Sequence, residues 1–415
     1  MADLDVVIVG AGAAGVGAGL ALQAAGKSFV IVEAAERIGG RAYTDKTSMP
    51  LPWDQGCHWL HCADVNPLVA HADRLGATYA RQERDDGAYR YWLKGHWLGQ
   101  DQLKIYGDAV DEAFEAVYEA ARQGLDVPVS EVLPDPGPYG GAVRHILQLM
   151  ASQDPELESA SGYGDYEDTE TNWPVVSGYG DLIERMARDL PIRTGVRVVS
   201  VAEEGGGVAI ETTDGTLHAS CAIVTVSTSV LNSGAIRFDS TEVQPVLEAA
   251  QHMPCGSYEK VCIGLERPLP GMEDTLFFTV EPQQGHPVNV QMLDWTDQMV
   301  ICHLGGSIAR DVGREGPESL RAFARERMVQ AFGADITRDI FGMAPTGWQD
   351  NPLVQGAYSA VLPGYAQARR DVIGQHTGRI GFAGEAFALQ WQATAHGAYQ
   401  SGQDVAARIM KEELS

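Results

Sequence analysis

The sequence predicts a protein of two domains: an α/β domain with a Rossmann-like sheet, and an interleaved α+β domain with a mixed sheet flanked by helices. Three observations lead to this prediction. An apolar strand, a glycine-rich turn and an alanine-rich helix open the chain. Apolar strand-like runs with turns return in the middle of the chain and again near its end. Mainly helical and alternating segments separate these returns.

The opening segment has the pattern of a dinucleotide-binding βαβ unit. Residues 5–9 form an apolar run, residues 10–15 a G-x-G-x-x-G turn, and residues 13–25 a helix. A second apolar run at residues 28–32 is followed by the acid Glu33. The glycines allow a tight turn, a close approach of the backbone to a pyrophosphate, and close packing of helix on strand. The acid would hold a ribose hydroxyl. We therefore expect contacts to an adenine dinucleotide from Gly10, Gly12, Ala13, Ala14, Gly15 and Glu33.

A second glycine-rich segment, residues 36–41, follows the second strand. The adjacent Gly39 and Gly40 let the backbone come close to a ligand, and Arg41 can neutralise phosphate. The alternative is an ordinary glycine loop with solvated arginines. The position of this segment directly after the dinucleotide-binding pattern favours the binding role.

The chain has 415 residues and a formal net charge of −26. This charge argues against nucleic-acid binding, because the phosphate backbone requires a basic surface. It could steer cationic substrates, although an acidic surface that only aids solubility would give the same charge. We expect neither a membrane span nor a signal peptide, since no apolar run is long enough and the first strand begins at residue 4 or 5. The six cysteines form no disulfide framework, which favours a cytoplasmic protein.

Residues 51–62 gather aromatic residues, histidines, cysteines and a glycine. Two cysteines around two histidines could suggest zinc, but the C-H-x-x-H-C spacing matches no usual ligand pattern, so no metal is expected. For His58 and His61, a core histidine bonded to the backbone is the ordinary alternative to a functional role.

The remaining elements follow from the periodicity of apolar residues. Helices are expected at residues 68–75, 109–123, 145–150, 181–190 and 317–332, and from near residue 394. Strands are expected at residues 196–201, 208–212, 222–226, 257–265, 277–280, 288–293 and 300–304, with an aromatic hairpin at 89–97 and a loop at 152–172. We assign residues 1–70, 173–253 and 345–415 to the cofactor domain, and residues 71–172 and 254–344 to the substrate domain.

The alternating run at residues 257–265 carries one lysine, Lys260. A surface lysine on an edge strand is the ordinary explanation of such a pattern. Next to a redox cofactor, its ammonium would instead stabilise developing negative charge.

The last return ends in a strand, a polar turn and a long helix that starts near Thr394. The helix N-terminus would place a second positive end beside the cofactor. Glu385 in the turn would accept backbone or hydroxyl donors near the pyrophosphate, with a helix-flanking acid as the alternative. We expect His396 to be a packed helix residue.

Together these motifs resemble the flavin amine oxidase family over nearly the whole chain. The resemblance rests on residues 10–15, Glu33, residues 37–41, the lysine-bearing strand and residues 393–398. It implies that the dinucleotide is FAD, bound at the domain boundary. The further FAD contacts that it implies are Gly39, Gly40, Arg41, Gly56, Cys57, His58, Trp59, Val198, Gly384, Glu385, Thr394 and Ala395.

The resemblance also implies roles near the substrate. Lys260 would hold a water against flavin N5, His61 would contact the amine, and Tyr358 and Trp391 would form aromatic walls. Thr394 replaces the second cage aromatic of monoamine oxidases. These features look like those of polyamine oxidases and histone demethylases, so they favour a polyamine or other aliphatic amine.

The attachment of the flavin is also predicted. Monoamine oxidases tether it through a cysteine just before an aromatic residue, and this chain has Ala357 at that position. We therefore expect non-covalent FAD.

The resulting expectation is an FAD-dependent amine oxidase. A hydride equivalent would pass from the α-carbon of a primary or secondary aliphatic amine to flavin N5, the imine would be hydrolysed, and oxygen would accept the electrons and form hydrogen peroxide. The expected partners are a cationic amine and molecular oxygen, bound by a monomer or homodimer.

Three alternatives remain open. An L-amino acid oxidase of the same fold needs an arginine for the substrate carboxylate, and none can be assigned from the sequence. A desaturase or porphyrinogen oxidase would want a larger apolar pocket. A flavoprotein that only binds amines, or a demethylase subunit, would be expected to carry basic tails or extra interaction domains. NAD-dependent dehydrogenation is disfavoured, because no second nucleotide fingerprint is present.

Overall fold

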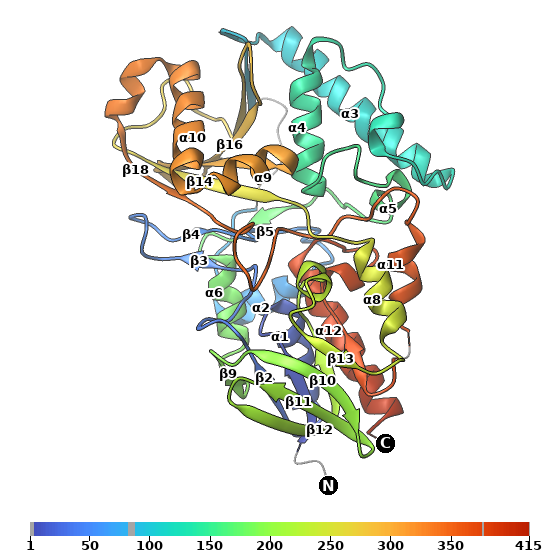
Figure 1. Cartoon of the computed structure of the whole chain (residues 1–415). Coiled ribbons are helices and arrows are strands. Elements are labelled where there is room, and N and C mark those ends of the chain that lie inside the picture. Colours follow the sequence, from blue (N-terminus) through green and yellow to red (C-terminus); the bar gives the residue numbers. More distant parts are fainter. Residues whose placement is uncertain (1–3, 82–87, 376, 415) are drawn as a thin grey trace.

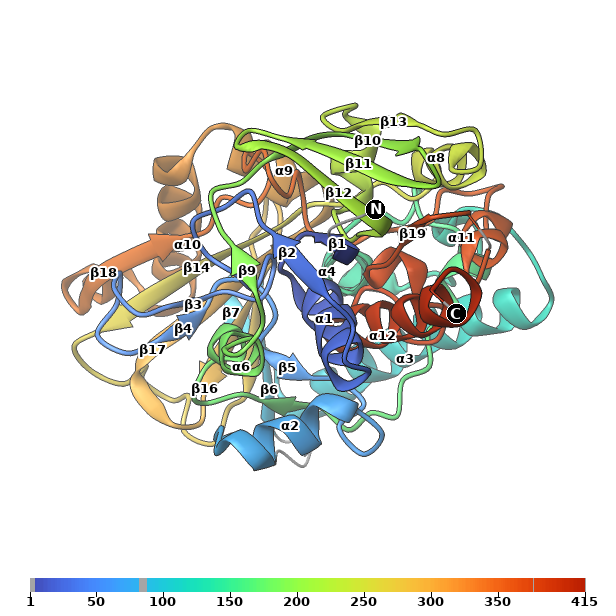
Figure 2. The same cartoon turned by 90° about the horizontal axis from the view of Figure 1, so that it is seen from below.

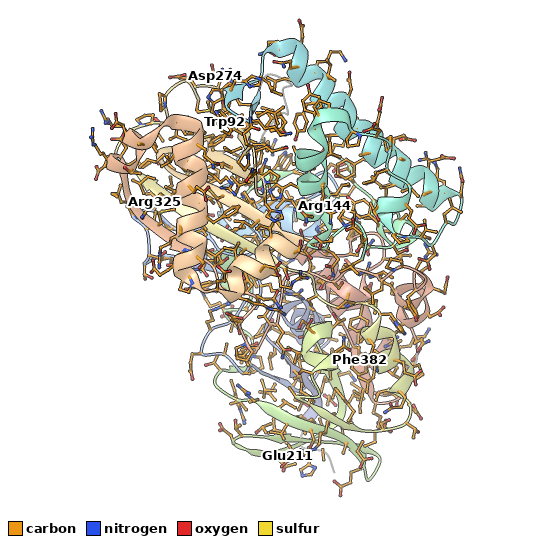
Figure 3. The ribbon with its side chains drawn as sticks, turned by 45° about the horizontal axis from the view of Figure 1, so that its top comes forward. Trp92, Arg144, Glu211, Asp274, Arg325 and Phe382 are labelled. Atoms are coloured by element: carbon orange, nitrogen blue, oxygen red, sulfur yellow. The ribbon has the colours of Figure 1, made fainter. Side chains whose placement is uncertain are left out.

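Two large sheets, each with its own helices, make up the computed structural model, which describes residues 4–81, 88–375 and 377–414. The two parts lie one above the other in Figure 1, and the chain passes between them several times. The side-chain view in Figure 3 shows Trp92 and Arg325 on the upper part and Glu211 on the lower part.

The lower sheet has the strand order β13-β10-β11-β12-β1-β2-β9, and β19 pairs with β12. Its strands are β1 (Leu4–Val9), β2 (Phe29–Val32), β9 (Ile192–Arg193), β10 (Val198–Glu204), β11 (Gly207–Thr212), β12 (Gly215–Val224), β13 (Arg237–Asp239) and β19 (Ile380–Phe382). β1 is parallel to β2 and β12, and β12 is parallel to β19. The carboxyl ends of these four strands therefore meet at one edge, where ligands of such sheets bind.

The upper sheet has the strand order β18-β14-β17-β16-β15-β6-β7. Its strands are β6 (Tyr89–Leu93), β7 (His96–Trp97), β14 (Tyr258–Leu265), β15 (Phe277–Glu281), β16 (Val288–Leu293), β17 (Thr296–Gly305) and β18 (Ile340–Pro345). β14 lies between β17 and β18, so Lys260 is on an inner strand and the edge-strand explanation is wrong. Two small sheets, β3–β4 (Thr44–Asp45, Trp53–Asp54) and β5–β8 (Trp59–Leu60, Trp173–Pro174), complete the strands described.

The α-helices are α1 (Ala13–Ala24), α2 (Pro67–Leu75), α3 (Gln100–Arg122), α4 (Gly140–Ala151), α5 (Ala160–Tyr163), α6 (Tyr179–Met186), α7 (Thr228–Asn232), α8 (Gln244–Gln251), α9 (Gly306–Arg314), α10 (Pro317–Phe332), α11 (Gln367–Val372) and α12 (Ala395–Glu412). Short 3₁₀ turns are η2 (Val129–Glu131), η3 (Gly137–Tyr139), η4 (Ala334–Arg338) and η5 (Glu385–Phe387). Within the described ranges, none of the helices has both the length and the apolar character that crossing a bilayer requires.

Most predicted elements are present with shifted ends. α10 has the predicted bounds, α2 begins one residue before the expected residue 68, and the aromatic hairpin is β6–β7. α3 begins nine residues before the expected residue 109, at Gln100, and α4 begins at Gly140 where a start at 145 was expected. α9 was not predicted, because it begins directly after β17 at Gly306, whose positive φ of 66° permits the change of direction.

The lower sheet takes its strands from residues 4–32, 192–239 and 380–382, and the upper sheet from 89–97 and 258–345. Each sheet is thus assembled from separate stretches of chain, as interleaved domains require. The precise borders between the domains stay a prediction.

Helices α1 and α12 cross at very close range beside the lower sheet, and Figure 2 shows them side by side. A Cβ at Gly17 would lie 2.2 Å from the Tyr399 carbonyl oxygen, and one at Gly402 would lie 2.0 Å from the Ala14 carbonyl oxygen. Only hydrogen fits at these two positions, so the crossing depends on glycine. Apolar side chains of β1, α1, α6 and α12 surround it in one buried cluster.

This contact can be tested with Gly402→Ala. The added methyl group must push α12 away from α1, so we expect the free energy of unfolding to fall by about 1–3 kcal/mol or more. Chemical denaturation measures it. In the control Gly107→Ala, within α3, the new Cβ meets nothing within 4 Å. There alanine should raise stability by about 0.5–1 kcal/mol, because it favours the helix. Equal effects at the two sites would contradict the close crossing.

Candidate active site

A cavity of about 520 Å³ lies between the two parts, and residues from both line it. The predicted site residues that line it are Gly10, Gly12, Ala13, Ala14, Glu33, Gly39, Gly40, Arg41, Gly56, Cys57, His58, Trp59, His61, Val198, Lys260, Tyr358, Gly384, Glu385, Thr394 and Ala395. They come from segments far apart in the sequence, so the fold brings the predicted motifs to a single place.

The fingerprint turn has the geometry that its glycines predict. Gly10 has φ 104°, and a Cβ there would lie 2.5 Å from Thr225 Oγ1. Gly15 does not line the cavity; its Cβ would lie 1.9 Å from the Gly10 carbonyl oxygen, so it serves the packing of helix on strand. Gly12 caps α1 without a side-chain hydrogen bond. This leaves the helix N-terminus able to bind an anion in the cavity.

Glu33 fixes the backbone at the end of β2. Its Oε2 accepts a hydrogen bond from the Ala11 amide at 2.8 Å, and its Oε1 accepts one from the Ala35 amide at 2.8 Å. Each carboxylate oxygen can accept a second donor. The position therefore fits the expected contact to a ribose hydroxyl and also ties the glycine turn to β2.

Arg41 and Glu385 form an ion pair that the sequence does not predict. Arg41 Nη1 lies 2.8 Å from Glu385 Oε1, and the two side chains are 25% and 6% exposed. Ser359 Oγ donates to Glu385 Oε2 at 2.7 Å. Although burial raises the pKa of Glu385, the Arg41 charge and these hydrogen bonds hold it below its ordinary value of 4.5. Glu385 is thus a carboxylate at neutral pH.

Arg369 extends this network into the interior. It is 1% exposed, and its Nη2 donates to Ser359 Oγ at 2.8 Å, while its Nε donates to the Ala386 carbonyl at 3.2 Å. Burial lowers the pKa of Arg369. Arg369 therefore orients Ser359, and through it Glu385, from behind the cavity wall. No sequence motif marks this residue.

Lys260 is 3% exposed, and its Nζ has three acceptors in reach. These are the carbonyl oxygens of Gly56 at 2.5 Å and Asp54 at 3.1 Å, and Nδ1 of His58 at 3.0 Å. Burial lowers the pKa of Lys260 to about 8, so the ammonium still predominates at neutral pH. All three of its hydrogens have acceptors, so the expected water could be held only by exchange for one of them.

His61 lies on the same cavity wall with its ring fixed by Asn172. Its Nδ1 lies 2.7 Å from Asn172 Oδ1, so Nδ1 carries the hydrogen and Nε2 is the basic nitrogen. Asn172 precedes β8 and was not predicted as a site residue. Its contact explains why His61 is held in one tautomer.

The aromatic walls differ from expectation. Tyr358 lines the cavity, its hydroxyl donates to the Leu149 carbonyl oxygen, and its ring lies 6.1 Å from that of Tyr258, which also lines the cavity. Trp391 is not among the lining residues; its ring packs against His396, with centroids 5.2 Å apart. The prediction of a wall at Trp391 is corrected accordingly, because its indole covers the start of α12.

Thr394 has a structural reason to precede α12. As the N-cap residue, its Oγ1 accepts a hydrogen bond from the Gly397 amide at 3.0 Å and donates to the Trp391 carbonyl at 2.7 Å. His396 is buried and does not line the cavity, in keeping with its expected packing role.

Arg37 stacks its guanidinium over the Tyr43 ring at 4.2 Å, on the rim of the glycine-rich segment. Across the described ranges, no group of three or more His, Cys, Asp or Glu side chains is placed to hold a metal ion.

The chain belongs to the family of flavin containing amine oxidoreductases, whose family model matches residues 13–151 and 141–410. Polyamine oxidase 2 of Arabidopsis thaliana is 26% identical over 431 residues, covering 96% of this chain and 86% of that protein. Lysine-specific histone demethylase 2 of Homo sapiens is 24% identical over 461 residues, covering 98% of this chain and 53% of that protein.

Solved structures share the fold. Cyclohexylamine oxidase from Brevibacterium oxydans IH-35A matches with a TM-score of 0.81 and 23% identity, over 100% of both chains. Wild-type putrescine oxidase bound to putrescine matches with a TM-score of 0.80 and 20% identity, over 99% of both chains. The chain is therefore a flavin-dependent oxidoreductase of the amine oxidase class, and its cofactor is FAD.

The residues present fit this cofactor. The open N-terminus of α1 and the close backbone approach of Gly12 to Gly39 and Gly40 suit a pyrophosphate. Glu33 suits a ribose, and the N-terminus of α12 supplies a second positive helix end.

The Arg41–Glu385 pair gives a prediction. In Glu385→Gln the half-buried guanidinium loses its charge partner, so we expect the free energy of unfolding to fall by about 1–3 kcal/mol at neutral pH. The Glu385 carboxyl has a lowered pKa in the folded protein, so its contribution is present above its ordinary pKa and is lost as the pH falls. The difference between wild type and variant should therefore shrink in acid.

The matched control is Asp108→Asn, which alters the exposed Lys104–Asp108 pair of α3. There the loss should stay below about 1 kcal/mol, because surface ion pairs contribute little. Urea denaturation at several pH values measures both variants. A Glu385 variant that matches the control would refute the structural role of the ion pair.

Proposed function

We propose that this chain oxidises a primary or secondary aliphatic amine of the polyamine type. The observation that carries the proposal is one cavity whose lining combines a buried ammonium, Lys260, with the oriented imidazole of His61 and the ring of Tyr358. Amines of this kind are cationic in water, and the net charge of −26 favours their approach. Asp168, an exposed carboxylate on the same cavity, supports an amine with a second charge.

The chemistry divides between cofactor and protein. FAD, when bound, accepts the hydride equivalent from the α-carbon of the amine and delivers the electrons to oxygen. His61 Nε2, as the basic nitrogen, accepts a proton or hydrogen bond from the substrate ammonium and favours the neutral amine. Tyr358, fixed through Leu149, limits the positions that the amine can take. Lys260 supplies positive charge where negative charge develops.

The nearest alternative, an L-amino acid oxidase, needs a cation for the substrate carboxylate. Among the described residues, the arginines that line the cavity are Arg37, Arg41 and Arg197. Arg41 is paired with Glu385, and Arg37 stacks on Tyr43. Arg197 adjoins Val198, where the resemblance places the adenine. With Arg41 and Arg37 engaged elsewhere and Arg197 near the expected adenine, amino acids are disfavoured as substrates.

The same cavity supports non-covalent attachment of FAD. Cys57 is the cysteine among its described lining residues, and its Sγ lies 3.5 Å from the Arg41 carbonyl oxygen. Burial raises the pKa of the Cys57 thiol to about 11, so it is a poor nucleophile at neutral pH. The six cysteines are all free thiols, which supports a reducing, cytoplasmic compartment. A monomer or homodimer without nucleic acid stays our prediction.

The substrate class can be tested by anaerobic mixing of the yellow protein with single amines. We expect spermine, spermidine, acetylated polyamine or putrescine to bleach the flavin absorbance faster than an aromatic monoamine or L-amino acids. Stopped-flow absorbance gives the rate for each compound. Bleaching by amino acids alone would replace this proposal with the alternative above.

A second prediction concerns Lys260→Met. Removing the buried charge should slow a flavin half-reaction, above all reoxidation by oxygen, by about tenfold to a hundredfold. Rapid mixing of the reduced protein with oxygenated buffer measures this rate. The control Lys104→Met removes an exposed lysine of α3 and should reoxidise at the wild-type rate. Equal rates in both variants would exclude Lys260 from this step.

A further inference from the structure

Lys260 is held by more than the backbone. An ammonium has three hydrogens. Two of them point to carbonyl oxygens, those of Gly56 and Asp54, and the third points to a side chain, that of His58. The carbonyls belong to a tightly packed segment, since a Cβ at Gly56 would lie 1.7 Å from the Arg41 carbonyl oxygen. His58 is therefore the acceptor of Lys260 that a substitution can remove without a change in the backbone.

The hydrogen bond to Lys260 also defines the state of His58. Nδ1 accepts from the ammonium, so the hydrogen of the neutral ring is on Nε2. Nε2 is buried and has no hydrogen-bond partner among the described residues. Within the described protein, the polar contact of the ring is therefore the one through Nδ1. Its orientation depends on Nδ1 and on packing against His303 and Trp59, at centroid distances of 5.6 and 5.4 Å.

We propose that His58 is a positioning residue of this active site, whose neutral imidazole accepts the third hydrogen of Lys260, fixes the ammonium in the cavity wall and keeps it protonated. The proposal rests on the role of Lys260 in the proposed function. It gives His58 a role beyond contact with the cofactor, because Lys260 then acts together with His58 as a hydrogen-bonded pair.

The surroundings leave Lys260 as the group that titrates near neutral and alkaline pH. Burial holds the pKa of His58 well below its ordinary value, and the Lys260 charge adds to this effect. Burial likewise keeps His303 neutral, and the Tyr258 hydroxyl donates to its Nδ1 at 2.9 Å. The imidazole of His61 also faces His58.

The acidic groups that face Lys260 have pKa values that differ from that of Lys260. Burial raises the pKa of Asp54 to about 6 and that of Cys57 to about 11. Cys262 lies two residues after Lys260 in β14, and burial raises its pKa far above that of Lys260. A transition near pH 8 thus reports on Lys260.

Two substitutions separate the hydrogen bond from the packing. His58→Phe keeps a ring against His303 and Trp59 but removes the acceptor. His58→Asn loses the ring but places Oδ1 where Nδ1 stands, at the same number of bonds from the backbone. The readout is the absorbance spectrum of the oxidised flavin in the holoprotein, titrated with base, since a charge beside the ring alters its bands. Lys260→Met identifies the transition by removing it.

Removal of the acceptor destabilises the charged form, so the pKa of Lys260 should fall. We expect the transition to move down by about one to two pH units in His58→Phe, and by less than half of that in His58→Asn. His396→Phe is the control, because this buried histidine lies off the cavity; its transition should match wild type. Should His58→Phe not fold, His58→Leu removes the same acceptor with a smaller side chain.

The proposal is overturned if the acceptor-free variant titrates like wild type, if the asparagine variant shifts as far as the phenylalanine variant, or if the transition survives Lys260→Met. This titration needs no amine. A failure of the proposed amine oxidation would show separately, as a flavin that no amine bleaches.

Discussion

The close crossing of α1 and α12 is the constraint on which the rest of the site depends. Because Gly17 and Gly402 have no side chains, the two helix backbones meet without an intervening layer. Their N-termini then open on the same cavity, one after the fingerprint turn and one at Thr394. A cofactor with an anionic pyrophosphate and a ring that gains negative charge needs two positive ends, and one helix could not supply both. A single pair of glycines thus links the packing of the core to the electrostatics of the site.

A second rule concerns the charges of Arg41, Glu385 and Arg369, each of which has specific partners. The Arg41–Glu385 pair is completed by Ser359 and Arg369, so four side chains at the cavity wall share two positive charges and one negative charge. Such networks stabilise little in net terms, since desolvation offsets attraction. These networks instead fix the positions of their side chains. The carboxylate and the guanidinium that line the cavity cannot rotate without breaking several hydrogen bonds.

Sequence reasoning succeeded where function requires local patterns. The fingerprint turn, Glu33 and the start of α12 were found because a strand, a turn and a helix leave periodic signals within a few residues. Asn172 was missed because its partner lies far off in the sequence: it bonds to His61 across 111 positions. Arg369 was missed although Ser359 and Ala386 are near it in the sequence, because no motif surrounds it. Nothing in a local pattern marks such a residue as part of a site. The expected ends of α3 and α4 were wrong for a related reason, since tertiary packing extends helices beyond their apolar stretch.

The prediction of an aromatic wall at Trp391 failed differently. A motif fixes the order of residues along the chain, but the direction of each side chain depends on the turn that carries it. The turn before α12 directs the indole onto His396 and presents Ala393 and Thr394 to the cavity. Lys260 shows the reverse case: its pattern fitted an exposed edge strand, and only its neighbours β17 and β18 make it an interior residue.

The order in which the lower sheet is assembled has a consequence for biosynthesis. β1 must wait for β12, and α1 must wait for α12, which begins only at Ala395. Since a ribosome adds roughly 5–20 residues per second, the first apolar strand remains without its full set of neighbours for tens of seconds. The upper sheet is complete once β18 has been made, before β19 and α12 exist. Nascent chains should therefore need protection by chaperones at their beginning, and FAD should be captured only after release.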